Sequence, residues 1–285
     1  MTFQDIYTRW ISDESRNVKS ATNATYATLA TTHIIPALGE KEGIGLEDVT
    51  EMMDEIQQKG LSRKTAWLCG NLVKTVLNYA ARKGWCSMPA WNVPMQTAGQ
   101  TRREAILTKD EHRKLLAYLV SDRTPRNIGL YLAATTGITR SELCNLIWQD
   151  IDFDNRLLHV VDSENGSIQR SIPLADAQLD FLLPERGIHL PENYVTSNGD
   201  TPSTVDAVRW YSGVVFKGLG LDGHQFKDLR ESFAVRCLES GCGLVVLAAL
   251  LGRNDYTNLV KAYGKYIRQD PKGDMERMME ELTED

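Results

Sequence analysis

Lysine and arginine side chains gather in one stretch of the chain that holds no acidic residue. Between positions 61 and 103 there is no Asp or Glu, although the whole protein has a net charge of −6. The basic residues of this stretch are Arg63, Lys64, Lys74, Arg82, Lys83, Arg102 and Arg103. Such a cluster is typical of a surface that neutralises nucleic-acid phosphates. A solvated charged face is the alternative interpretation.

Short motifs follow one another in the second part of the chain. They are TGITRSEL at 136–143 with LIWQDID at 146–152, a predicted hairpin that ends in SIPL at 171–174, KDLRESFA at 227–234, and LLGR at 250–253. Tyr263 follows ten positions after Arg253. In this order the motifs resemble those of the tyrosine recombinases, the phage integrase family. Segments 33–39 and 75–84 are similar to parts of the same family, so the resemblance covers nearly the whole chain.

The resemblance implies phosphoryl transfer to a tyrosine, without a metal or another cofactor. The tyrosine oxygen attacks a DNA phosphate and a 5′ hydroxyl leaves, so cations must meet the growing charge and an acid must protonate the leaving oxygen. Carried over residue by residue, Tyr263 is the nucleophile, Arg230 is a phosphate ligand, and Lys227 stands where a histidine is usual. Tyr266 is a less well placed nucleophile. A tyrosine that only packs its ring is the structural alternative for Tyr263.

Three positions of the implied catalytic set hold other residues. Thr139 stands where the first arginine is expected, and Arg140 follows it, directed about 100° away if both lie on one helix. Glu164 and Asn165 occupy the hairpin turn where a lysine is expected, and no lysine occurs between Lys114 and Lys217. Arg253 replaces a histidine. Losing one preorganised charge contact costs on the order of a hundred- to a thousandfold in rate, so we expect impaired strand cleavage. Arg140 and Arg253 remain candidate DNA ligands.

The elements that must position these residues are mainly helical. In 48–56, apolar residues at Val49, Met52, Met53 and Ile56 have the i, i+3, i+4, i+7 spacing of one helix face. A second stripe in 62–83 predicts another helix, ended by Gly84; its members are Trp67, Leu68, Leu72, Val73, Val76 and Leu77. Thr108 and Glu111 form a capping-box pattern that begins a later helix.

A change of period predicts a small sheet in the second part. Segments 156–162 and 167–173 are rich in β-forming residues and flank a turn signal at 164–166, which indicates a hairpin. Residues 194–196 are a candidate third strand, and the chain from Val205 onward again has helical patterns. We therefore expect a mainly α protein with a small antiparallel β-sheet, the two-domain tyrosine-recombinase fold.

The expected domains are a helical core-binding domain at 1–95, a linker at 96–107 with prolines just before it, an α+β catalytic-type domain at 108–270 and a tail helix at 271–285. In the tail, Met275, Met278, Met279 and Leu282 form an apolar stripe on an acidic helix. The resemblance implies that such a helix docks on a neighbouring protomer. Closing onto its own domain is the alternative.

Composition excludes several classes of protein. No apolar run is long enough to span a membrane, and residues 1–5 lack the features of a signal peptide, so we expect a cytoplasmic protein. The five cysteines are scattered and form none of the close pairs of zinc sites or redox motifs. We expect neither a metal nor a cofactor.

Three functional hypotheses follow. The first is a sequence-specific duplex-DNA-binding protein, impaired in cleavage and acting as a transcriptional regulator or repressor of a mobile element. The second is an active recombinase that compensates through Arg140, Lys227 and Arg253. The third, favoured only by the acidic net charge, is an accessory interaction protein that no longer contacts DNA.

Overall fold

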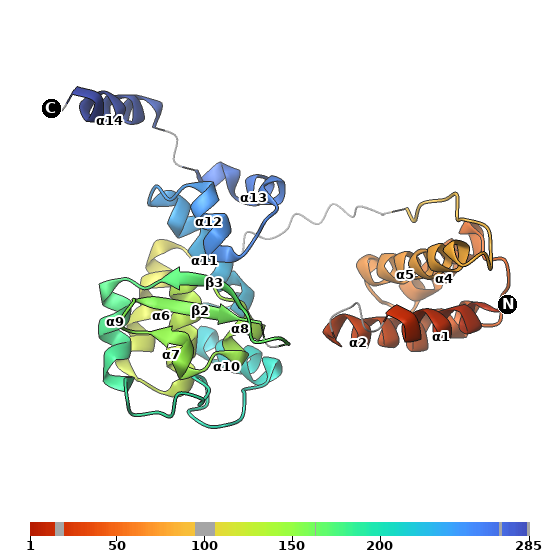
Figure 1. The fold of residues 1–285 in the computed structure, drawn as a ribbon, viewed down its shortest axis with the longest axis horizontal. Helices are drawn as coiled ribbons and strands as arrows, with labels where there is room; N and C mark the ends of the chain where they lie inside the picture. The colour runs from red at the N-terminus through yellow and green to blue at the C-terminus, as the bar shows by residue number, and fades with distance from the viewer. Residues whose placement is uncertain (15–19, 95–105, 163, 268–269, 284–285) are drawn as a thin grey trace. The chain divides into compact units, whose positions relative to one another are not determined.

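The computed structural model of the protein describes residues 1–14, 20–94, 106–162, 164–267 and 270–283. The chain divides into two compact units, Met1–Arg102 and Arg103–Asp285 (Figure 1). Each unit buries an apolar core of its own. Within the described ranges, none of the helices has both the length and the apolar character needed to cross a bilayer.

The first unit is helical. Its helices are α1 (Phe3–Glu14), α2 (Ser20–Leu29), α3 (Ile35–Leu38), α4 (Leu46–Gln58) and α5 (Arg63–Arg82), with a π-helical turn at Ala30–Ile34. The four residues of the expected apolar face of α4 are all buried. Ser62 begins α5 because its Oγ accepts a hydrogen bond from the Thr65 amide at 3.1 Å, and Gly84, at φ 75°, follows its end.

The apolar stripe expected along α5 is only partly correct. Leu72, Val73, Val76 and Leu77 are buried, but Leu68 is 37% exposed. Cys69 is buried in its place, and since successive helix residues point about 100° apart, Leu68 lies off the packed face. α4 and α5 pack against each other. The face of α5 that carries Cys69, Leu72, Val73 and Val76 therefore contributes to the core of the first unit.

The second unit combines helices with one small sheet. Its helices are α6 (Lys109–Ser121), α7 (Pro125–Thr136), α8 (Arg140–Asn145), α9 (Asp176–Leu182), α10 (Val205–Gly218), α11 (Phe226–Glu239), α12 (Leu244–Leu251), α13 (Tyr256–Tyr263) and α14 (Pro271–Thr283). Short 3-10 turns occupy Trp148–Asp150, Leu183–Glu185 and Gly264–Tyr266. The capping box at Thr108 and Glu111 is confirmed. Leu107, expected at the end of the linker, is fully buried and donates its amide to Ser232 Oγ at 2.9 Å.

The sheet is antiparallel and has the order β1-β2-β3; β2 and β3 lie side by side in Figure 1. Its strands are β1 (Ile151–Asp152), β2 (Leu157–Val161) and β3 (Ile168–Pro173). The expected hairpin is confirmed, with Leu158 opposite Ile172. The expectation of a strand at 194–196 is wrong: Tyr194 forms only single bridges with Ile147 and Gly199. The Asp152 carboxylate accepts the Asn155 amide in a tight turn, so β1 pairs directly with β2.

Candidate active site and nucleic-acid interface

An open cavity of about 710 Å³ in the second unit has five positive side chains among its lining residues. These are Arg140, Arg209, Lys227, Arg230 and Arg253. Glu231 is the one carboxylate among the described residues that line it, and His224 lies there as well. Low-dielectric walls concentrate the field of such cations, so the cavity is suited to bind an anion such as a phosphate.

Arg230, on α11, is anchored by the backbone around it. Its Nη1 donates to the Gly137 carbonyl at 2.7 Å and its Nη2 to the Leu251 carbonyl at 2.6 Å. Burial lowers the pKa of Arg230 and the Glu142 carboxylate opposes that shift, but an arginine stays protonated in proteins. Because these two bonds use only part of its set of N–H donors, the guanidinium is held in place with donors left for a phosphate.

Lys227 lies one helical turn before Arg230 on α11, and its side chain is exposed. Residues three apart share a helix face, and both line the cavity. The structure therefore brings together two of the cations that the sequence singled out.

Thr139 caps a helix at the position where the resemblance implies an arginine. It precedes α8 with an extended backbone, its Oγ1 accepts the Glu142 amide at 3.3 Å, and its own amide donates to Glu142 Oε2 at 2.7 Å. Arg140 begins the helix, and both residues line the cavity. Because Thr139 lies outside the helix, the angular separation of helix neighbours does not apply, and Arg140 does reach the cavity wall.

Arg253 follows α12 after a single glycine. Gly252 ends that helix in a left-handed conformation, φ 62°, and the Arg253 amide donates to the Ala248 carbonyl at 2.9 Å. The Arg253 side chain is exposed and lines the cavity. Its charge lies near enough to Arg230 to lower the pKa of that residue, after the larger effect of burial.

The hairpin turn supplies no group to the cavity within its described part. Glu164 is exposed and is not among the cavity-lining residues. Its amide donates to Asp162 Oδ1 at 2.9 Å, and Asn165 Oδ1 accepts the Ser167 amide at 2.9 Å. These bonds are those of an ordinary polar turn.

Tyr263 ends α13 and is almost fully buried, with 3% of its surface exposed. Its hydroxyl donates to Glu231 Oε2 at 2.6 Å. Burial and then the Glu231 carboxylate raise the pKa of Tyr263, against smaller opposing effects of Arg253 and Arg230. Tyr266 lies in the following 3-10 turn, half-buried, with the Lys265 ammonium 4.9 Å from its ring centre.

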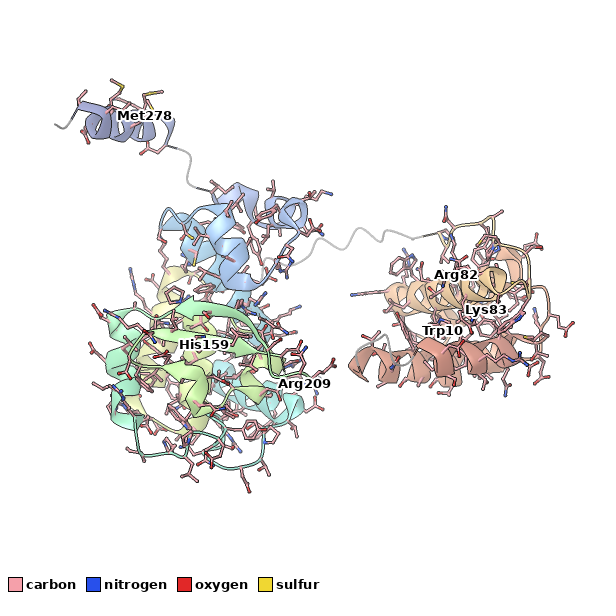
Figure 2. The ribbon with its side chains drawn as sticks, viewed as in Figure 1. Trp10, Arg82, Lys83, His159, Arg209 and Met278 are labelled. Atoms are coloured by element: carbon pink, nitrogen blue, oxygen red, sulfur yellow. The ribbon has the colours of Figure 1, made fainter. Side chains whose placement is uncertain are left out.

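Three residues of the site were missed by the sequence analysis. Arg170, on β3, forms an ion pair with Glu142. Side chains two apart on a strand share a face, so the apolar Ile172 indicated that Arg170 points toward the protein interior. Arg209, labelled in Figure 2, belongs to α10. It lines the cavity and pairs with Asp206 at 3.2 Å. Glu231 gave no local signal, because its partner Tyr263 is distant in sequence.

The basic residues of the first unit are spread along α5. Arg63, Lys64 and Arg82 are exposed, whereas Lys74 donates to Asn92 Oδ1 at 2.6 Å. Lys83, beside Arg82 in Figure 2, lies 3.7 Å from an Asp13 carboxylate oxygen and 5.4 Å from the centre of the Tyr79 ring. Arg102 and Arg103 lie outside the described residues.

The chain belongs to the phage integrase family, whose family model matches residues 105–269, more than half of the protein. Among curated proteins it is 30% identical over 175 residues to the tyrosine recombinase XerA of Pyrococcus horikoshii, covering 57% of this chain and 59% of that protein. It is 22% identical over 257 residues to a tyrosine recombinase XerC-like protein of Caldanaerobacter subterraneus, covering 75% and 65%. The chain thus spans about three fifths of the length of these relatives.

Solved structures show the same fold. The Tn1549 transposon integrase, in complex with a circular intermediate DNA, matches with a TM-score of 0.76 at 20% identity, over 99% of this chain and 100% of that one. A lambda integrase dimer bound to a COC′ core site matches with a TM-score of 0.70 at 23% identity, over 91% and 75%. The protein therefore has the two-domain fold of the tyrosine recombinases, mainly helical with a small antiparallel sheet.

Proposed function

We propose that the protein binds duplex DNA sequence-specifically and is impaired in strand cleavage. The cavity of the second unit carries the proposal: Arg140, Lys227, Arg230 and Arg253 line one hollow in a protein of net charge −6. A cluster of cations of this kind contributes phosphate affinity that does not depend on base sequence. Arg63 and Lys64 at the start of α5 and Arg82 at its end are further exposed basic residues.

Impaired cleavage is the part of the proposal that rests on the altered positions. The hydroxyl and amide of Thr139 cap α8 through hydrogen bonds with Glu142. The position where the resemblance implies an arginine therefore carries no cation. The described hairpin turn brings no proton donor to the cavity. Phosphate contacts and groove-reading helices need neither group, so binding persists where cleavage is slow.

In this proposal the protein acts as a transcriptional regulator or repressor of a mobile element. The proposal includes self-association through α14, on which Met275, Met278, Met279 and Leu282 are all at least 45% exposed. An unpaired apolar stripe on a polar helix is a surface that a second copy of the chain would cover.

A working recombinase is the second candidate, and one observation favours it. Arg140 lines the same cavity as Arg230, so the chain has a cation one residue beyond the position where the resemblance implies one. In this alternative Arg140, Lys227 and Arg253 stabilise the transition state, and Tyr263 forms the covalent bond to DNA.

One experiment separates the two candidates. Fragmented DNA from the source organism is retained on the purified protein and then washed with detergent, which removes all fragments that are not covalently attached. Fragments held before the wash and lost after it support a non-cleaving binder. Fragments that survive the wash, and disappear in Tyr263→Phe, establish the recombinase. Failure to retain any duplex at low salt contradicts both and favours a protein that no longer contacts DNA.

A further inference from the structure

The residue next to Arg230 in sequence contacts the candidate nucleophile. Glu231 Oε2 accepts the hydroxyl proton of Tyr263 in a 2.6 Å hydrogen bond between α11 and α13. Glu231 is among the cavity-lining residues, whereas Tyr263 is not and is only 3% exposed. The carboxylate therefore lies at the cavity wall and the phenol lies behind it.

The chemistry of this contact opposes attack on a phosphate. An ionised carboxylate only accepts hydrogen bonds, so it holds Tyr263 as a protonated donor, and bonds to charged acceptors are the stronger ones. To attack, the phenol oxygen must leave Glu231 and enter the cavity, and this movement breaks the hydrogen bond between them. A carboxylate beside the cavity also repels a DNA phosphate.

We infer that Glu231 is a latch that keeps the Tyr263 hydroxyl protonated and outside the phosphate cavity. The inference deepens the proposed function and rests on it, since it assigns to one residue the restraint of the nucleophile in a DNA-binding site. It concerns the access of the phenol, which is measurable whether or not the chain cleaves DNA.

The opposite role for the same contact is a general base. A carboxylate that accepts a proton from a nucleophile can also promote its attack. The two roles predict opposite changes in the reactivity of the Tyr263 hydroxyl when the charge of Glu231 is removed. Reactivity increases if Glu231 is a latch, and it decreases if Glu231 is a base.

The test uses the full chain and N-acetylimidazole, a reagent that transfers its acetyl group to a phenol oxygen while imidazole leaves with the proton. Trypsin cleaves after Lys261 and Lys265, so Tyr263 is the single tyrosine of its peptide and is separated from Tyr266, the internal reference. The variants are Glu231→Ala and the isosteric Glu231→Gln. The matched control is Asp206→Asn, which removes a negative charge that lies beside the cavity-lining Arg209 and is exposed.

We expect acetylation of Tyr263 to accelerate by about tenfold or more in Glu231→Ala, as loss of a hydrogen bond to a charged group implies. Glu231→Gln gives a smaller increase, because the amide oxygen still accepts a bond. Asp206→Asn and the reference Tyr266 stay unchanged. An unchanged rate for Tyr263 in both Glu231 variants, with the chain still folded by circular dichroism, overturns the latch.

Duplex retention by the same variants keeps the two proposals separate. Faster acetylation with no retained duplex supports the latch and contradicts the proposed DNA binding. Retained duplex with unchanged acetylation leaves DNA binding in place and overturns the latch. If the wild-type chain forms a detergent-resistant adduct that falls in Glu231→Gln, Glu231 is a base and the latch is wrong.

Discussion

Arg170 and Glu142 form a bidentate ion pair that joins β3 to α8. Arg170 Nη1 lies 2.7 Å from Glu142 Oε1 and its Nη2 donates to Oε2 at 2.9 Å, with the side chains 7% and 20% exposed. The Arg170 Nε donates to the Leu250 carbonyl, and Arg230 donates to the adjacent Leu251 carbonyl. Two arginines thus hold the carboxyl end of α12, and the pair fixes the point from which Arg253 enters the cavity.

Replacing Arg170 by alanine should strongly destabilise the second unit. The change leaves Glu142, which is only 20% exposed, without its ion-pair partner, and removing one partner of a buried pair typically costs about 3–5 kcal/mol of unfolding free energy. Denaturant unfolding of the full chain measures the loss in the transition of that unit. The control is Arg186→Ala, which breaks an exposed pair with Asp154 and should cost about 0–1 kcal/mol. Equal losses of unfolding free energy in the two variants would show that the Arg170–Glu142 pair stabilises the protein no more than an exposed pair does.

The Arg170–Glu142 pair should also make stability depend on pH. Burial raises the pKa of Glu142, but the Arg170 guanidinium and the Thr139 amide more than offset that effect and hold it below its ordinary value. In the unfolded chain the pKa returns to about 4.3, so the unfolded state takes up the proton first as the pH falls. The stabilisation is therefore complete above that value and is lost as the pH drops through the folded-state pKa.

Unfolding free energies at a series of acidic pH values check this dependence. Glu142→Gln should flatten the curve, because its amide does not titrate. If the variant and the wild-type chain lose stability in parallel as the pH falls, other carboxylates carry the acid sensitivity.

Gly137→Ala should disturb the anchor of Arg230. Gly137 has φ 68°, its carbonyl accepts from Arg230 Nη1, and an added Cβ would overlap the Phe233 ring. The left-handed conformation alone costs a residue with a side chain about 1–2 kcal/mol, and the overlap adds to it. Gly166→Ala is the matched control, with φ 70° and no atom within 4 Å of the added Cβ.

We expect Gly137→Ala to lose more unfolding free energy than Gly166→Ala and to weaken duplex retention, whereas Gly166→Ala keeps retention intact. Thermal melting and filter retention of duplex measure the two effects. Equal behaviour of the two glycine variants would mean that the ring of Phe233 moves aside and that Arg230 keeps its place.

Lys227→Ala should weaken binding to duplexes of different sequence by about the same factor. Lys227 is exposed and lines the cavity. Log affinity falls as log salt rises, and loss of one phosphate contact makes this fall less steep by about 1. Arg113→Ala on α6 is the control, because Arg113 pairs with Asp110 and is not among the cavity-lining residues. Titrations of duplex at several salt concentrations give both slopes. An unchanged slope for Lys227→Ala would remove this lysine from the proposed interface.

Local features of the fold were predictable because they depend on neighbours in sequence. The apolar spacing of α4 and the capping box at Thr108 predict helices by themselves, and two segments rich in β-forming residues on either side of a turn signal predict the β2–β3 hairpin. The strand at 194–196 and the exposed Leu68 show the limit of such patterns. Which of several apolar segments joins a sheet or a core depends on what packs against it.

For the candidate site, too, some residues were predictable from the sequence and others were not. From the order of its motifs alone, the sequence determined the family of the chain and pointed to Arg230, Lys227, Arg253 and Tyr263. Only the tertiary structure decided that Arg140 shares the cavity with Thr139, that Arg170 pairs with Glu142 across 28 positions, and that Glu231 holds Tyr263 across 32. These contacts join separate elements, so they follow from how α8, α11, α13 and β3 pack, which no local pattern of residues specifies.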